Sequence, residues 1–232
     1  MGGGKSGNGG GRRDNRNWGG VSNLTREGML DGYHMYDSKA EIEDALGEDA
    51  QEWKDGLTPA EEVAVEWYTG NGHRPLNEFE RNGIQSKSYS VEQLMEASDN
   101  LESALSKGHL GERMVVNRTS SADLLDGAST VAEIRKKFGE VVTDKGFTSS
   151  EISLKTSTDN PYDAKQGEKQ IRYHIKVPAG DGIGQYVQPI ANAQNEREFL
   201  FNRGSSYKIV GAYNDAQGQV HVNLRYVGRN VK

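Results

Sequence analysis

The chain has 232 residues, a formal net charge of −6 and no cysteine. Its length is enough for one well-filled hydrophobic core, alone or with a helical appendage. The lack of cysteine excludes disulfides, thiolate catalysis and cysteine-based zinc sites. No run of about eighteen apolar residues occurs, so we expect no membrane span. The net negative charge argues against a broad nucleic-acid surface on the globular part.

Residues 1–22 are rich in glycine, asparagine and arginine and poor in apolar side chains. Such a segment cannot offset the entropy lost on ordering, so we predict a disordered tail. Its arginines make it the one part of the chain where contact with nucleic acid is expected. No apolar core of a signal peptide is visible near the start. The expected locations are therefore the cytoplasm of the producing or infected cell, or delivery by a phage particle or a secretion system.

Two stretches carry the signals of helix starts. In the first, Thr58 fits an N-cap, Pro59 a first helical position and Glu61 the closing residue of a capping box. We expect Gly70 and Gly72 to end this helix. Its predicted apolar face consists of Ala60, Val63, Ala64, Trp67 and Tyr68.

The second helix start is a capping box made by Ser90 and Gln93, and Gly108 is expected to terminate that helix. Its predicted apolar stripe consists of Val91, Leu94, Met95, Leu101 and Leu105. Both stripes are interpreted as faces that pack in a core. Residues 23–56, ahead of these helices, are predicted to form a helical lead-in or cap.

From about residue 112 the pattern changes to short strands. Apolar or alternating segments occur at 114–116, 171–177, 186–187, 199–201, 207–213 and 220–227. The last two flank residues 214–218, whose composition is typical of a hairpin turn. Helices first and mostly antiparallel strands later predict an α+β fold rather than an alternating βαβ fold.

The segment 195–201 places two carboxylates directly before an apolar, strand-forming run. In an extended strand Glu196 and Glu198 would point to one face and Arg197 to the other. Two like charges beside a buried strand are costly, which favours a functional role for them. For such a pair taken alone, a solvated strand end is the more common explanation, because surface charge is common.

Two further segments accompany this pair of carboxylates. Arg118 follows the apolar run 114–116, and Ser149 lies in a hydroxyl cluster after Phe147. The order of arginine, serine and Glu-x-Glu resembles the R-S-E signature of ADP-ribosyltransferases. The likeness is to the bacterial exoenzyme family that includes the Rho-modifying clostridial exoenzymes, the actin-modifying binary toxins and related phage-encoded transferases.

The resemblance extends over about residues 57–228, and we take 57–232 as a catalytic domain. Tyr68 and Asn77 resemble a helical motif in which a tyrosine and an asparagine approach the nucleotide. The implied fold has N-terminal helices packed on two mostly antiparallel sheets around an NAD cleft. Two departures stand out: the family's Ser-Thr-Ser motif reads Ser149-Ser150-Glu151 here, and the loop before Glu196 has no aromatic residue.

The resemblance implies a role for each of these residues, with NAD as substrate and no metal. Arg118 would bind the phosphates or the adjoining ribose through paired hydrogen bonds. Glu198 would stabilise the oxocarbenium-like sugar left when nicotinamide departs, and Ser149 would fix the rotamer of Glu198. In this family a glutamate at the place of Glu196 accompanies modification of arginine, so the implied partner is a protein bearing an acceptor arginine.

Several alternatives remain at this point. The same residues would serve an NAD glycohydrolase with water as the acceptor. A glycosidase-like pair of carboxylates is a second option, although such pairs normally face each other across a cleft. A virion or assembly protein that keeps the fold for binding, and a nucleic-acid module built on the tail, are the other two.

The five histidines show no metal-ligand spacing. His174 and His221 fall on the polar faces of predicted strands, and we expect both to be solvated.

Overall fold

The computed structural model describes residues 32–152, 170–192 and 197–230 of the chain. The predicted tail at 1–22 and the carboxylate of Glu196 lie outside these ranges. The helical elements are α2 (Lys39–Asp55), α3 (Pro59–Trp67), the π-helix η1 (Tyr68–Gly72), α4 (His73–Asn82), α5 (Val91–Ser106), the 3-10 helix η2 (Asp123–Leu125) and α6 (Val131–Arg135).

The strands follow the first helices along the chain. They are β1 (His109–Leu110), β2 (Met114–Ser120), β3 (Val141–Thr143), β4 (Thr148–Ile152), β5 (Ile171–Val177), β6 (Gly180–Asp181), β7 (Gly184–Tyr186), β8 (Glu198–Phe201), β9 (Ser205–Asn214) and β10 (Val220–Arg229). The predicted strand segments and the hairpin between β9 and β10 are confirmed.

Eight of these strands form one sheet in the order β3-β9-β10-β5-β2-β4-β8-β7, and β1 pairs with β6 in a second, two-stranded sheet. Every pair is antiparallel except β5 with β10. The predicted α+β class is therefore confirmed. The large sheet curls. Strands β8 and β9 lie near opposite ends of the strand order, yet the ring of Phe201 on β8 is 5.6 Å from that of Tyr207 on β9.

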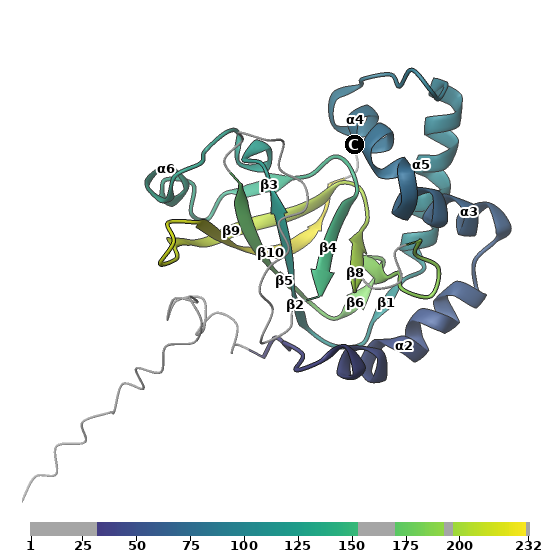
Figure 1. Ribbon diagram of the computed structural model, residues 1–232, viewed down its shortest axis with the longest axis horizontal. Helices are drawn as coiled ribbons and strands as arrows, with labels where there is room; N and C mark the ends of the chain where they lie inside the picture. Colours follow the sequence, from purple (N-terminus) through teal and green to yellow (C-terminus); the bar gives the residue numbers. More distant parts are fainter. Residues whose placement is uncertain (1–31, 153–169, 193–196, 231–232) are drawn as a thin grey trace, which may run out of the picture.

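Two hydrophobic cores result from this arrangement. The first lies inside the curled sheet and gathers side chains from both of its halves, such as Ile175 and Phe199. The second lies between α3, α4, α5 and the outer side of β8, where Leu200 contributes. Figure 1 shows these three helices grouped on one side of the sheet, with α2 running along another edge.

Helix α2 contributes to both cores. Ile42, Leu46 and Ala50 belong to the core inside the sheet, whereas Trp53 belongs to the core under the helices. The indole Nε1 of Trp53 donates a hydrogen bond of 2.8 Å to the carbonyl of Ala104 on α5. The predicted helical character of this lead-in is confirmed over the described residues, while the division at residue 57 stays a prediction.

Both predicted capping boxes are present, at Thr58 with Glu61 and at Ser90 with Gln93. In α5 the leucines of the predicted stripe are fully buried, but Met95 is 53 % exposed. In α3 the buried side includes Val65, while the predicted Val63 is 63 % exposed. The face expected for α3 is thus rotated by part of a turn.

The expectation that Gly70 and Gly72 end the first helix is wrong. The chain passes through the π-helix η1 directly into α4, and the helix ends at Gly83, which has φ 67°. A Cβ on Gly72 would lie 2.4 Å from the ring of Trp67. This glycine therefore allows a close approach of the indole rather than a chain reversal.

The expectation that His174 and His221 are solvated is also wrong. Both are buried, with Nε2 of His174 2.8 Å from Nδ1 of His221. The outer ends of this pair contact Asn117 and Asp215, and the ring of Tyr213 stacks beside them. Burial, with the nearby His221, lowers the pKa of His174 to about 3.

Among the described residues, no helix combines the length and apolar character needed to cross a bilayer.

The buried Glu61 joins α3 to α5. Its carboxylate accepts hydrogen bonds from the Thr58 N–H at 2.7 Å, the Ser103 hydroxyl at 2.7 Å and the Lys107 ammonium at 2.6 Å. Burial acts to raise the pKa of Glu61, but these donors outweigh it and lower the pKa to about 2. A carboxylate with a lowered pKa stabilises the folded state above its unfolded pKa and loses that contribution as the pH falls.

We predict that Glu61→Gln lowers the free energy of unfolding at pH 7 by about 2–3 kcal/mol. The difference from wild type should shrink between about pH 4.5 and pH 2, as wild-type Glu61 becomes protonated. Urea unfolding at several pH values measures this, with the exposed Glu66→Gln as control. A difference that does not change with pH would contradict the assignment.

Candidate active site

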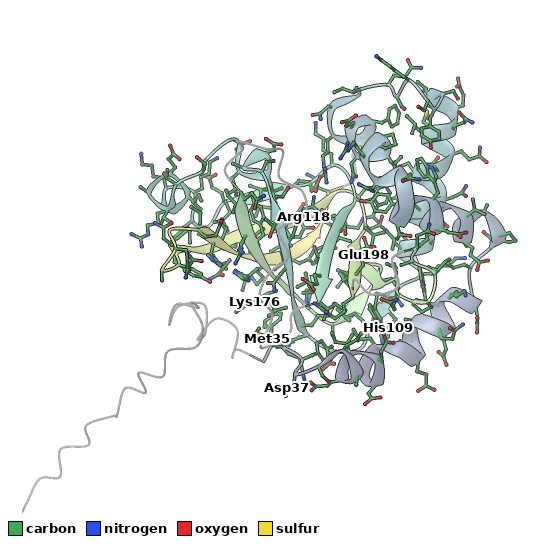
Figure 2. All side chains as sticks on the ribbon, viewed as in Figure 1. Met35, Asp37, His109, Arg118, Lys176 and Glu198 are labelled. Carbon is green, nitrogen blue, oxygen red and sulfur yellow. The ribbon has the colours of Figure 1, made fainter. Side chains whose placement is uncertain are left out.

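The predicted site residues meet around strand β4. This strand lies between β2, which carries Arg118, and β8, which begins at Glu198. Figure 2 shows the two labelled side chains on either side of β4. Residues far apart in the sequence are thus brought to one region of the sheet.

Ser149 and Glu198 lie on the same face of the sheet. In the antiparallel ladder of β4 and β8, Ser149 is opposite Leu200 and Glu151 is opposite Glu198. Directly opposed residues share a face, so Ser149 and Glu198 are diagonal neighbours. Since Leu200 packs under the helices, this face looks toward the helical layer. Glu198 is only 7 % exposed. The hydrogen bond predicted between Ser149 and Glu198 stays a prediction.

The side chain of Arg118 contacts the backbone of β4. The paired register of β2 and β4 covers only Val116 with Ile152 and Asn117 with Glu151. One residue further on, Nη1 of Arg118 donates a hydrogen bond of 2.6 Å to the carbonyl of Ser149. The guanidinium has five N–H donors, so this contact is compatible with a second, forked contact to a phosphate.

Tyr68 and Asn77 hold the backbone of Phe147, the residue directly before β4. The Tyr68 hydroxyl donates to the Phe147 carbonyl at 3.1 Å, and Asn77 Oδ1 accepts from the Phe147 N–H at 2.8 Å. Asn77 Nδ2 also donates to the Tyr68 hydroxyl at 2.9 Å. Both side chains are buried. The structure thus gives them a positioning role at the start of β4, and their contact with a nucleotide stays a prediction.

Two residues missed by the sequence analysis, Arg81 and Asp144, form a clamp around the backbone of Phe147 together with Tyr68 and Asn77. Arg81 binds Asp144 through two hydrogen bonds of 2.7 and 2.8 Å and also donates to the Phe147 carbonyl at 3.1 Å. Asp144 in turn accepts from the Gly146 N–H and the Thr148 hydroxyl. The one local signal is an aspartate two residues before a glycine, a common turn pattern that does not reveal Arg81.

Gly146 is required by the same clamp. A Cβ at this position would lie 2.5 Å from Asn77 Oδ1, the atom that accepts the Phe147 N–H. A side chain here would therefore displace the amide that fixes the start of β4.

Tyr68 lies close enough to Arg118 and to Glu198 for their charges to act on its hydroxyl. Burial raises the pKa of Tyr68 above its usual value, and the charges of Arg81, Glu198 and Arg118 also act on this hydroxyl. Tyr68 is therefore a neutral hydrogen-bond donor at physiological pH. It lies within electrostatic range of both Glu198 and Arg118.

Arg197 departs from the expected extended conformation. Arg197 has φ 46°, in the left-handed region, and β8 begins only at Glu198. The expectation that strand alternation runs through Arg197 is therefore wrong. The Arg197 guanidinium forms an ion pair with Glu151 on β4. The role of Glu196 stays a prediction.

Within the ranges that the structure describes, no group of three or more His, Asp or Glu side chains is arranged to hold a metal ion.

The fold and this arrangement match a known family. The sequence model of the ADP-ribosyltransferase exoenzyme family matches residues 45–226, which is most of the chain. The chain therefore belongs to the ADP-ribosyltransferase exoenzyme family, and the resemblance seen in the sequence is confirmed.

One curated relative is similar in sequence. It is the NAD(+)--arginine ADP-ribosyltransferase EFV of Enterococcus faecalis (strain ATCC 700802 / V583), 28 % identical over 169 residues. The matched region is 71 % of this chain and 31 % of that protein, so the chain spans about a third of the relative's length.

Solved structures of toxins share the fold. Plx2a, an ADP-ribosyltransferase toxin from Paenibacillus larvae, has a TM-score of 0.68 at 19 % identity, over 84 % of this chain and 100 % of that one. The Clostridium limosum C3 exoenzyme has a TM-score of 0.67 at 17 % identity, over 86 % and 99 %. BECa of a C. perfringens binary enterotoxin, solved with NADH, has a TM-score of 0.68 at 22 % identity, over 83 % and 50 %.

We predict that Asp144→Asn lowers the free energy of unfolding by about 2–3 kcal/mol, because it leaves the part-buried Arg81 without its ionic partner. Chemical denaturation measures the loss. Asp126→Asn is the matched control, since Asp126 is 81 % exposed and pairs with Lys137 at the surface. Equal, small losses in the two variants would contradict a structural role for the clamp.

Proposed function

We propose that this protein transfers ADP-ribose from NAD to an arginine side chain of a target protein and releases nicotinamide. The observation that carries the proposal is the buried Glu198, held on β8 with Arg118 across β4, in a chain of the ADP-ribosyltransferase exoenzyme family. The name of the Enterococcus faecalis relative supports arginine as the acceptor.

The roles proposed for Arg118 and Glu198 follow from the charges of NAD. Its pyrophosphate is anionic, which suits the forked donors of Arg118. Cleavage of the nicotinamide bond leaves a positively charged, oxocarbenium-like ribose, which a nearby carboxylate stabilises. Burial of Glu198 strengthens this effect because the surroundings screen charge less than water does. Ser149, on the same face, would hydrogen-bond Glu198 and fix its rotamer.

Tyr68 and Asn77 are proposed to support NAD binding mainly in an indirect way, by holding the backbone of Phe147. Their polar atoms are engaged with Phe147 and with each other, two residues before Ser149. A shift of the Phe147 backbone would move β4, and with it both Ser149 and the Ser149 carbonyl that orients Arg118. Small displacements of positioning groups are costly in catalysis.

Glu196 is proposed to act on the acceptor. An arginine guanidinium is protonated in proteins, so as a nucleophile it needs a carboxylate to orient it and accept its proton. Glu198 alone would suffice to cleave NAD with water as acceptor. Glu196 would therefore distinguish transfer to arginine from NAD hydrolysis.

We predict that Glu198→Gln reduces nicotinamide release from NAD by about 100-fold or more, because the amide cannot balance the developing charge. Purified wild type and variant are compared with and without agmatine as an arginine analogue. Release by wild type should rise with agmatine. Glu140→Gln, at an exposed position, is the control and should match wild type. Near-normal release by Glu198→Gln would overturn the mechanism.

We predict that Glu196→Gln leaves NAD hydrolysis within a few-fold of wild type but abolishes transfer to agmatine. The reason is that the amide no longer accepts the proton of the guanidinium. Mass spectrometry of ADP-ribosyl-agmatine, beside nicotinamide release from the same reaction, separates the two activities. A parallel loss of both would show that Glu196 does not act on the acceptor side.

A further inference from the structure

Two carboxylates face each other beside the proposed site. Glu151 on β4 is directly opposite Glu198 on β8, so both side chains lie on one face of the sheet. Glu198 is buried, and the Glu151 side chain is 28 % exposed. Like charges directly opposite each other destabilise an antiparallel pair and raise the pKa of one partner. In the family motif described above, a serine is usual where this chain has Glu151.

Arg197 offsets this repulsion. Its guanidinium forms an ion pair with Glu151, and its side chain is 17 % exposed. Its carbonyl accepts a hydrogen bond of 3.0 Å from the N–H of Ile152, so both backbone and side chain join it to β4 around Glu151. A left-handed conformation is strained for a non-glycine residue. Arg197 holds this conformation at φ 46° while it makes both contacts.

Other charged or polar groups of this region make contacts of their own. Arg118 on β2 donates to the Ser149 carbonyl, and Arg81 on α4 pairs with Asp144. Tyr68 from η1 is kept neutral by burial. Asn117, opposite Glu151 on β2, carries no charge. Among these groups, Arg197 is the cation paired with Glu151.

We infer that Arg197 is a positioning residue that neutralises Glu151 and thereby keeps Glu198 ionised and fixed beside the NAD site. The inference rests on the proposed role of Glu198. It explains why this chain tolerates a carboxylate at position 151: the arginine immediately before Glu198 supplies the balancing charge. Without Arg197, the two glutamates would compete for one proton.

The test is a pH titration of glutamate side chains by NMR, with 13C at the carboxyl carbon. The Glu198 and Glu151 signals are assigned from the spectra of Glu198→Gln and Glu151→Gln. We expect Arg197→Gln to raise the titration midpoint of the pair by about 1 pH unit or more. Adding Glu151→Gln to that variant should return Glu198 to within a few tenths of its wild-type midpoint. Arg225→Gln, an equal change of charge at an exposed position on β10, should leave the midpoint unchanged.

A second variant covers the case in which Arg197→Gln does not fold. Glu151→Ser leaves Arg197 beside Glu198, so the midpoint of Glu198 should fall relative to wild type. An unchanged midpoint in whichever of these variants folds would overturn the inference.

Nicotinamide release provides a separate readout. The acid limb of the kcat/KM profile should move to higher pH in Arg197→Gln and back in the double variant. If wild type releases no nicotinamide, the proposed function fails, while the titration still decides the role of Arg197. A loss of activity with no shift of the acid limb or of the NMR midpoint would also overturn the inference.

Discussion

The geometry of the site depends on how the backbone N–H and C=O of Phe147 are held. Asn77 accepts its N–H, while Tyr68 and Arg81 donate to its carbonyl. Strand β4 begins at the next residue, and the order β2-β4-β8 is built around that strand. One residue, whose backbone N–H and C=O are both satisfied by the helical layer, thus sets the position of the serine, the arginine contact and the ladder that carries Glu198.

The curled sheet separates packing from chemistry. Its inner face is apolar and fills the larger core. On the outer face, the registers align a row of polar side chains across five strands. The row consists of Asn223, His174, Asn117, Glu151 and Glu198. Toward one end of the row His174 belongs to the buried histidine pair, and at the other end lies the proposed catalytic carboxylate of Glu198, so the polar side chains of this face form one continuous row beside the apolar core.

Local signals in the sequence predicted local structure well. Capping boxes marked two helix starts, and alternation marked strands such as β5, because both depend on residues a few positions apart. The burial of His174 and the clamp between Arg81 and Asp144 could not be read in this way, since their partners are distant in the chain. The left-handed conformation of Arg197 was missed for the same reason: it accompanies an ion pair to another strand.

The long-range registers have a consequence for how the protein folds. The partners Asn77 and Phe147 are 70 residues apart in the chain, and Asn117 and His174 are 57 apart. The backbone hydrogen bonds within each of the helices α3 to α5 are short-range, so these helices can form early, whereas the pairing of β4 with β8 must wait for a long loop to close. Until then the run Phe199, Leu200 and Phe201 lacks β4, one of its two neighbouring strands. The segment that carries the proposed catalytic glutamate is therefore vulnerable to misassembly until β4 is in place.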